Sequence, residues 1–355
     1  MSGTNQSKHK KLELSKSKEF QKLRTWLEQA KRVLISTHSL PDGDGIGAEV
    51  ALYHYFKRAR KACRVYNPDI LPKRYRFIDP KAAILLGPGQ VELWDTCDLW
   101  LIVDTNDPRR LGRLWGELSL RAKKIVFLDH HPEIANVADI TYPPHATLIS
   151  DEQSSSIGEL LYNVFAELNL TKINKDVALG LYVSIMTDTN SFRYSRTTPL
   201  AHKIAGEMIE LGVNPEEVYQ NIYSSKELIH LHLLGHLLQN VKVAAGGKIA
   251  WFEIPLEMRK KHQVSNDDSQ SFLNLLLLLK DAEVVCLFRE DEDEHVKVSI
   301  KSKGQVIINR VAIEFGGGGH EYAAGLTLSA PLDKTVDAVI KRLETTVESH
   351  ERFGK

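Results

Sequence analysis

The sequence predicts an α/β protein with a mostly parallel N-terminal sheet, helices on both faces of that sheet, and a smaller C-terminal α/β domain. The first observation is that short β-prone apolar runs alternate with stretches of helical periodicity through the first half of the chain. The second is size, because 355 residues with 43% hydrophobic composition are enough for two domains with separate cores. No internal repeat is visible.

The first domain is expected to contain three helices and four strands. A helix is expected over 19–30, where Phe20 and Leu23 begin an apolar pattern with helical spacing. Two more helices are expected over 157–168 and 175–186. Between the first of these helices and the other two, continuous apolar runs typical of buried parallel strands occur at 33–37, 64–66, 99–103 and 125–128.

The second domain shows a different order of elements. Long helical periodicity over 204–240 is interpreted as a connector, and a Leu-rich helix is expected over 270–280. The acidic run 290–294 is interpreted as a solvated hairpin tip. Strands are expected over 249–254, 283–288 and 295–301, and a closing helix over 332–348. The predicted parts are therefore a flexible basic tail (1–18), a first domain (19–203), a helical connector (204–245) and a second domain (246–355).

Composition excludes several classes of protein. The chain has 46 Lys and Arg against 46 Asp and Glu, whereas proteins that coat long nucleic acids are usually basic. Its cysteines, Cys63, Cys97 and Cys286, are too few and scattered for a disulfide framework or a zinc ribbon. The most apolar stretch, 272–279, is shorter than the roughly 20 residues of a membrane span and is interrupted by Asn274. We therefore expect a cytoplasmic protein with no membrane partner.

Histidine and aspartate side chains gather where predicted elements end. Four segments contribute them: those that follow the runs 33–37, 99–103 and 125–128, and the one that follows the helix ending near residue 186. Because ligands bind beyond the carboxyl ends of the strands in open parallel sheets, we expect these side chains to share one rim. The candidates are His38, Asp42, Asp44, Asp104, Asp129, His130, His131 and Asp188.

These residue types predict a metal centre. Imidazole and carboxylate suit manganese, magnesium or iron better than ions that prefer thiolate. Five or six ligands exceed the need of one ion, whereas two ions about 3.5–4 Å apart that share a carboxylate would use them all. A loop containing Gly43, Gly45 and Gly47 is expected to curl so that its ligands converge. Individually each residue also has a structural explanation, as a helix cap or a packing histidine, and Asp129 is interpreted as orienting a histidine.

The motifs resemble those of a known family. His-x-x-Pro-Asp-x-Asp at 38–44, the strand-end Asp104, Asp-His-His at 129–131 and Thr-Asp-Thr at 187–189 are similar to the motifs of DHH phosphoesterases. Four glycines, His320 and the following Glu-Tyr-Ala-Ala-Gly resemble the signature of the DHH-associated C-terminal domain. Length and domain plan are most similar to the nanoRNase branch, whose members are oligoribonucleases that also dephosphorylate 3′-phosphoadenosine 5′-phosphate (pAp).

The resemblance implies a two-metal mechanism in the first domain. Manganese is the expected ion, with magnesium or cobalt as alternatives, and a metal-bridging water would attack phosphorus in line. One ion would be held by His38, Asp42 and Asp104. The other would be held by Asp44, His130, Asp188 and the same Asp104, which would bridge the two ions. The catalytic residues would be Asp104, Asp129 and His131, with His131 contacting the scissile phosphate.

The resemblance also implies that the second domain binds substrate, with the active-site cleft between the domains. A glycine turn exposes backbone N–H groups that form an anion nest. Lys301 stands where the family pattern has arginine, and lysine lacks the planar bidentate fork of a guanidinium. The expected substrate-binding residues are Arg193, Arg289, Ser299, Lys301, Gly317, Gly318, Gly319 and His320.

The resulting hypothesis is a manganese-dependent phosphodiesterase or exoribonuclease that hydrolyses di- to pentanucleotides to mononucleotides, with pAp 3′-phosphatase activity. Hydrolysis of linear or cyclic dinucleotide messengers is an alternative, because the metal-site residues do not distinguish it from hydrolysis of short oligonucleotides. A processive single-strand DNA exonuclease fits the length and charge less well, and an inorganic pyrophosphatase should lack the glycine-run domain. A non-catalytic nucleotide-binding module is the alternative from another class. A homodimer is compatible with the resemblance.

Overall fold

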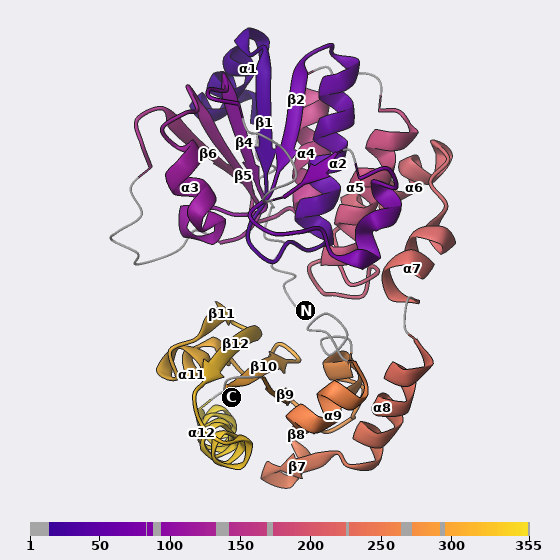
Figure 1. Cartoon of the computed structure of the whole chain (residues 1–355), viewed down its shortest axis with the longest axis vertical. Coiled ribbons are helices and arrows are strands. Elements are labelled where there is room, and N and C mark those ends of the chain that lie inside the picture. The colour runs from indigo at the N-terminus through magenta and orange to yellow at the C-terminus, as the bar shows by residue number, and fades with distance from the viewer. Residues whose placement is uncertain are drawn as a thin grey trace, which may run out of the picture. The chain divides into compact units, whose positions relative to one another are not determined.

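The computed structural model describes residues 14–82, 84–87, 94–132, 142–168, 173–224, 227–263, 272–291 and 295–353. The chain divides into two compact units, Met1–Ser225 and Lys226–Lys355, here called the N-terminal and C-terminal units (Figure 1). Each contains its own six-stranded sheet, so the predicted α/β class with a second α/β domain is confirmed. Within the described ranges, no helix combines the length and apolar character needed to cross a membrane.

The sheet of the N-terminal unit is entirely parallel. Its strand order is β3-β2-β1-β4-β5-β6, and every neighbouring pair runs in the same direction. All residues of the central β4 and β5 are buried, as continuous apolar runs predict for a sheet covered on both faces. The edge strands β3 and β6 were not predicted, because one has two residues and the other alternates in burial. The strands are β1 Arg32–Ser36, β2 Ala62–Tyr66, β3 Leu85–Leu86, β4 Leu99–Val103, β5 Ile125–Asp129 and β6 Ala146–Ser150.

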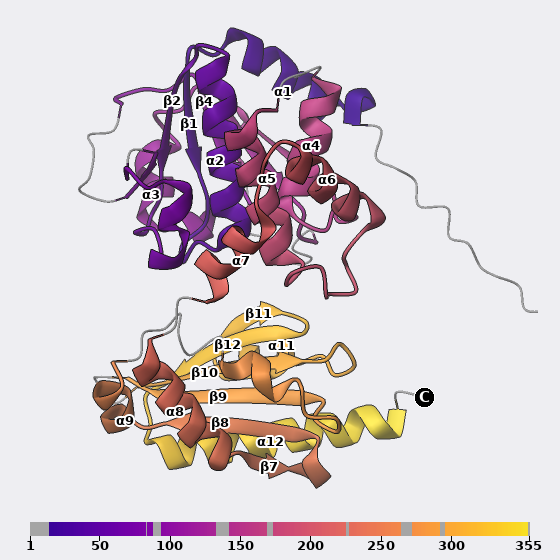
Figure 2. The ribbon, with the colours of Figure 1, turned by 90° about the vertical axis from the view of Figure 1, so that its right-hand side faces the viewer.

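Helices cover both faces of this sheet (Figure 2). One face carries the larger core, to which α1, α2 and α4–α7 contribute, and the other packs against α3 and a short 3₁₀ helix, η3. The helices are α1 Lys18–Gln29, α2 Gly43–Arg58, α3 Arg113–Leu118, α4 Ile157–Glu167, α5 Lys175–Asp188, α6 Pro199–Glu210 and α7 Pro215–Tyr223, with 3₁₀ helices η1 Leu14–Lys16, η2 Lys73–Ile78 and η3 Pro108–Leu111.

The glycine segment after β1 corrects our expectation of a curled loop. Residues from Gly43 onward form α2, and none of the three glycines in its first turns has a positive φ. Their small size is what matters, because a Cβ on Gly47 would lie 2.4 Å from the carbonyl oxygen of Gly180, and one on Gly45 would lie 2.2 Å from Thr37 Oγ1. Helix α2 therefore approaches α5 and the end of β1 closely enough to hold its N-terminus at the sheet edge.

The predicted connector, 204–245, does not form a separate segment. Its first part, α6 and α7, belongs to the N-terminal unit, where Ile204 and Val218 join the main core. Its second part contains α8 Leu228–Gln239, whose Leu233 and Leu237 belong to a core of the C-terminal unit. Helical periodicity alone does not reveal which core an apolar face packs against, and so the boundary at 225/226 was missed.

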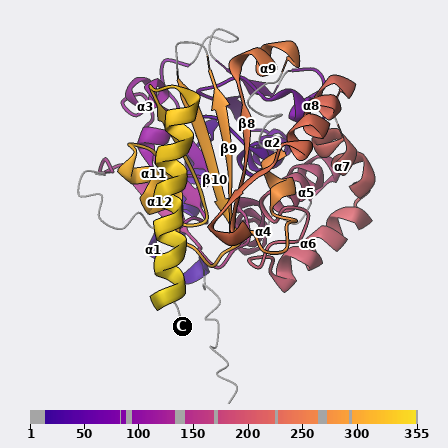
Figure 3. The ribbon, with the colours of Figure 1, turned by 90° about the horizontal axis from the view of Figure 1, so that it is seen from below.

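The sheet of the C-terminal unit is mixed, in the order β11-β12-β10-β9-β8-β7. Only β8 and β9 pair in parallel, and the other neighbours are antiparallel. The long helix α12 packs with α11 on one face (Figure 3), and α8 with the helical residues 272–276 packs on the other. The elements are β7 Lys242–Ala244, η4 Ala245–Gly247, β8 Ile249–Ile254, α9 Leu256–Lys261, β9 Val284–Glu290, β10 Val296–Ser302, α11 Asn309–Glu314, β11 Gly318–His320, β12 Ala323–Leu328 and α12 Leu332–Phe353.

Three predicted features lie partly outside the described residues: the start of the basic tail (1–13), the first residues of the Leu-rich helix (270–271), and the middle of the acidic hairpin tip (292–294). The strands predicted on either side of that tip are found as β9 and β10.

Candidate metal centre and substrate-binding residues

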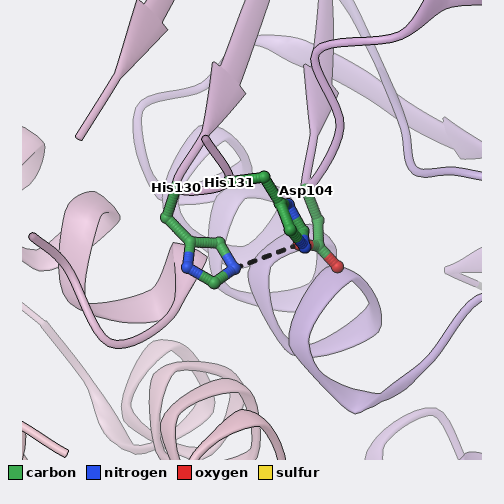
Figure 4. Close-up of side chains that lie close together, drawn as sticks. All are labelled: Asp104, His130 and His131. Atoms are coloured by element: carbon green, nitrogen blue, oxygen red, sulfur yellow. Dashed lines mark ion pairs between the residues drawn. The ribbon is translucent and has the colours of Figure 1, made fainter. Parts of the chain in front are cut away.

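The candidate ligands converge at one edge of the N-terminal sheet. Those after β1, β4 and β5 lie beyond the carboxyl ends of the strands, and the start of α2 and the end of α5 bring the others to them. Figure 4 shows three of these side chains together. Three groups have ligand atoms that all lie within 4.8 Å of one another: His38, Asp42 and Asp104; Asp44, His130 and Asp188; and Asp104, His130 and His131.

Asp104 lies between two sets of ligands. Its Oδ2 is 3.4 Å from His38 Nε2, and its Oδ1 is 3.5 Å from His130 Nε2. The residue is 2% exposed and has a φ of 64°, a left-handed conformation that non-glycine residues rarely adopt. Its backbone N–H donates to the Leu128 carbonyl at 2.9 Å, which holds this conformation against β5. The two carboxylate oxygens thus face different histidines, as a bridging ligand requires.

The ring of His38 is oriented for ligation. Its Nδ1 lies 2.7 Å from the carbonyl oxygen of Ser39, to which a protonated Nδ1 donates. That hydrogen bond leaves the Nε2 lone pair directed at Asp104, the arrangement typical of a metal-binding histidine. Asp42, exposed at the N-cap of α2, completes this group and accepts a hydrogen bond from the Asp44 N–H at 3.0 Å.

The second group surrounds His130 Nε2, which lies 3.1 Å from Asp44 Oδ2 and 3.7 Å from Asp188 Oδ2. Asp44 is held by the Ile157 N–H at the start of α4, at 3.0 Å, and by the Ser184 hydroxyl. Among the described residues, Asp104 Oδ1, His130 Nε2 and Asp188 Oδ2 are buried atoms that make no hydrogen bond within normal distance and angle limits, although charged groups lie 3.1–3.5 Å from them. Buried polar atoms are rarely left so, and three of them directed at one another fit a bound cation.

The electrostatics of the cluster also favour a divalent cation. Burial raises the pKa of Asp44 and of Asp188, and in each case a neighbouring carboxylate adds to the effect. Burial would also raise the pKa of Asp104 and lower that of His130, but their hydrogen bonding and the surrounding charges reverse both shifts. Several buried carboxylates thus lie close together here, and divalent ions would neutralise them.

Asp129 positions His131. Its Oδ1 accepts a hydrogen bond from His131 Nδ1 at 2.7 Å and from the backbone N–H of His130 at 2.9 Å. We predicted that Asp129 orients a histidine ligand, and the structure shows that the ring it holds is His131. A proton on Nδ1 leaves Nε2 as the acceptor nitrogen of that ring.

The two arginines after α5 differ in position. Arg193, our predicted phosphate ligand, is exposed, and its guanidinium donates to the backbone and side-chain oxygens of Asn190 at 2.9 and 3.0 Å. Arg196 instead lies at the candidate metal centre, with Nη2 3.2 Å from Asp188 Oδ2 and 2.5 Å from His130 Nδ1. Sequence reasoning missed Arg196, because nothing in Arg-Tyr-Ser-Arg (193–196) indicates which arginine turns toward Asp188.

Three predicted substrate residues share one face of the C-terminal sheet. Arg289 pairs with Lys297 across β9 and β10, and Ser299 and Lys301 follow at alternate positions on the same strand. Arg289 is 3% exposed, with Nη2 4.0 Å from Asp291 Oδ2. Lys301 Nζ donates to Asn274 Oδ1 at 2.8 Å, and burial lowers its pKa.

The glycine run is a helix cap followed by a strand, which corrects our expectation of an anion nest across the whole run. The N–H groups of Gly316 and Gly317 donate to the carbonyls of Ile313 and Ala312 and so end α11. The N–H of Gly317 is therefore not available to a substrate. Residues Gly318–His320 form β11, paired with β12, and the side chain of His320 lies outside the described structure.

Comparison with known proteins agrees with this architecture. Residues 32–185 match the DHH family N-terminal domain, and residues 245–349 match the DHHA1 domain. The chain belongs to the DHH family. This confirms the resemblance drawn from the motifs, and the two matched domains lie in the two structural units.

Relatives of similar length support the same assignment. The DHH chain is 28% identical to the bifunctional oligoribonuclease and PAP phosphatase NrnA of Thermus thermophilus, over 87% of this chain and 88% of that protein. It is 25% identical to the Bacillus subtilis protein of the same name, over 90% and 96%. A crystal structure of an exopolyphosphatase-related protein from Bacteroides fragilis superposes with a TM-score of 0.83 at 26% identity, covering 94% and 96%.

Proposed function

We propose that this DHH protein is a phosphodiesterase, dependent on divalent metal, that hydrolyses short oligoribonucleotides to mononucleotides and removes the 3′-phosphate of pAp. The observation that carries the proposal is the position of Asp104, whose two oxygens face two separate histidine-containing ligand groups. Similarity over most of both chains to proteins named bifunctional oligoribonuclease and PAP phosphatase supports the substrate class.

The residues present fit two ions. His38, Asp42 and Asp104 would hold one ion, and Asp44, Asp104, His130 and Asp188 the other. Mixed imidazole and carboxylate donors favour manganese, with magnesium or cobalt as alternatives. When bound, two such ions supply a water nucleophile at neutral pH and neutralise charge that develops at phosphorus.

The chain's own residues complete the site. His131, oriented by Asp129, would present its ring to an oxygen of the phosphate under attack. The polar face formed by Arg289, Ser299 and Lys301 would bind the remainder of the substrate, together with β11. Lys301 would act as a point charge and not as a bidentate fork, so we expect it to contribute affinity more than orientation.

A substrate panel with manganese tests the proposal. It compares pAp, dinucleotides, linear and cyclic dinucleotide messengers, pyrophosphate, and long single-stranded RNA and DNA. We expect the highest kcat/KM for dinucleotides, with turnover of pAp. A preference for pyrophosphate or for long strands would contradict the proposal, and absence of any turnover would favour a nucleotide-binding module. A cytoplasmic location and a homodimer stay predictions.

A further inference from the structure

An unusual turn follows the candidate ligand Asp188. Asn190, Ser191 and Phe192 have φ values of 49°, 58° and 63°, three consecutive non-glycine residues in the left-handed region. This conformation is sterically disfavoured for each of them and persists only where the surroundings impose it. The turn therefore indicates that the chain after α5 is held in a particular path.

Thr189 supplies much of that constraint. Its side chain is fully buried, its Oγ1 accepts the N–H of Phe192 at 3.1 Å, and the same hydroxyl donates to the Ile185 carbonyl at 2.6 Å. Its own carbonyl accepts the N–H groups of Arg193 and Tyr194 at 2.9 and 3.1 Å. These bonds fix where residues 193–196 leave the turn, and they separate the two arginines.

Arg196 lies at the edge of the Asp44, His130 and Asp188 group. Its Nη2 contacts Asp188 and His130 Nδ1, yet the side chain is 42% exposed. The side chain of Asp188 is itself 25% exposed. A cationic fork beside three candidate metal ligands, open to solvent, is in reach of an anion that approaches them.

The contact between Arg196 and His130 places a hydrogen-bond donor against the ring nitrogen that carries the proton when the other nitrogen binds a metal. A guanidinium only donates hydrogen bonds, so this contact is a hydrogen bond only when His130 Nδ1 is unprotonated and the ring proton is on Nε2. Ligation by Nε2 requires the proton on Nδ1, where the Ser154 carbonyl lies 3.4 Å away as an acceptor. A divalent ion and Arg196 therefore compete for His130. Because both are cations, they also compete for the carboxylate of Asp188.

We infer that Arg196 is a phosphate-binding residue: its guanidinium donates to a non-bridging oxygen of the substrate phosphate and competes with the divalent ion for Asp188 and His130. The inference rests on the proposed function for the identity of the substrate. When a metal ion displaces the guanidinium from His130, its N–H groups can donate to an oxygen of the phosphate, which is an anionic acceptor. The same residue thus lowers metal affinity and raises phosphate affinity.

Three full-length variants test this inference. Arg196→Gln removes the charge, Arg196→Lys keeps the charge without the fork, and Arg58→Gln is a control. Arg58 is exposed at the opposite end of α2 from Asp44, about 20 Å away along the helix. Metal-stripped proteins are titrated with Mn²⁺ by calorimetry, and manganese-loaded proteins are titrated with inorganic phosphate. Steady-state kinetics with a dinucleotide complete the set.

We expect the two affinities to change in opposite directions. In Arg196→Gln, Mn²⁺ should bind about 3–10-fold more tightly and inorganic phosphate about tenfold more weakly, with kcat/KM for the dinucleotide lowered by about 10–100-fold. Arg196→Lys should keep wild-type Mn²⁺ affinity and lose phosphate affinity, and Arg58→Gln should match wild type in every measurement.

Unchanged or weaker Mn²⁺ binding in Arg196→Gln, or unchanged phosphate binding, would overturn the inference. If the Gln variant does not fold, the phosphate titration of Arg196→Lys decides. Both affinities are read without turnover, so a wild-type protein that binds both ligands as expected but leaves dinucleotides intact would contradict only the proposed function.

Discussion

The two units place their candidate functional residues in different parts of a sheet. In the N-terminal unit the strands are parallel and covered on both faces, and the polar residues stand at the carboxyl edge. In the C-terminal unit the candidates stand within the strands, at alternate positions on one face of β9 and β10. Parallel strands bring their carboxyl ends together at one edge of the sheet, whereas antiparallel pairing groups side chains from neighbouring strands on one face.

This difference predicts different consequences of mutation. Edge residues of the N-terminal unit belong to one closely spaced cluster, so the loss of one member should affect the whole centre. Residues on the face of the C-terminal sheet stand at alternate positions along neighbouring strands and should contribute separately to substrate affinity.

The largest expected effect is that of Asp188→Asn. Removing one carboxylate from the group around His130 should lower kcat by about a thousandfold or more, because charge stabilisation at phosphorus depends on an occupied centre. The measurement is dinucleotide hydrolysis at saturating Mn²⁺. Asp176→Asn, an exposed change at the opposite end of α5, is the control and should retain activity. A fully active Asp188→Asn would remove this residue from the centre.

A smaller loss is expected for Asp129→Asn. The amide keeps the shape of the side chain, but its oxygen is a weaker acceptor and its NH₂ group favours the wrong tautomer of His131. We expect kcat to fall by about 10–100-fold with Mn²⁺ stoichiometry unchanged. Calorimetry and kinetics on the same preparation separate the two effects, and a loss of bound metal would show that Asp129 supports the ligands themselves.

The sequence predicted the edge residues of the N-terminal unit better than their surroundings. Strand-end positions followed from continuous apolar runs, so His38, Asp104 and His130 were expected on one rim. The beginning of α2 was missed, because glycines at 43, 45 and 47 suggest a loop when their tight packing against α5 and Thr37 is not known. Arg196 was missed because its direction depends on the left-handed turn before it.

The C-terminal unit was harder to read from the sequence. Its strands at 249–254 and near 295–301 were predicted, but strand register was not, and register is what places Arg289 on the face of Ser299 and Lys301. The glycine run suggested an anion nest, whereas the first two glycines serve the end of α11. In both cases the decisive contact joins residues that sequence periodicity does not connect.

For the C-terminal face we expect a graded effect from Lys301→Met. The change removes a point charge and leaves Asn274 without its donor, so KM for a dinucleotide should rise by about 3–10-fold while kcat changes less. Lys334→Met on the exposed side of α12 is the matched control. A fall in kcat with unchanged KM would mean that Lys301 acts on the reacting phosphate, contrary to the comparison between the units.

The smallest expected effect on catalysis comes from changing Glu49, a buried carboxyl behind the candidate metal centre. Burial raises the pKa of Glu49 to about 8, although Asn67 donates a hydrogen bond to Oε2 at 2.8 Å. Between about pH 4.5, the pKa of Glu49 in the unfolded chain, and about pH 8, the folded state keeps a proton that the unfolded chain has released. The free energy of unfolding should therefore fall as pH rises through this range.

Glu49→Gln mimics the protonated form and should remove that loss. Thermal unfolding of metal-stripped protein from pH 5 to pH 8.5 should show similar stability of wild type and variant at pH 5, with the variant about 3–4 kcal/mol more stable at pH 8. Glu117→Gln, exposed on α3, is the control. A variant that is less stable at every pH would show that the charged form of Glu49 is needed for folding.

The bridging role of Asp104 is tested most directly by counting metal ions. Calorimetric titration with Mn²⁺ compares metal-stripped wild type with Asp104→Asn, a replacement that tolerates the left-handed backbone at this position. We predict two ions per wild-type chain, and in Asp104→Asn weakened binding of both ions together with loss of hydrolysis. One ion per wild-type chain, or two ions bound by the variant with wild-type affinity, would contradict the account.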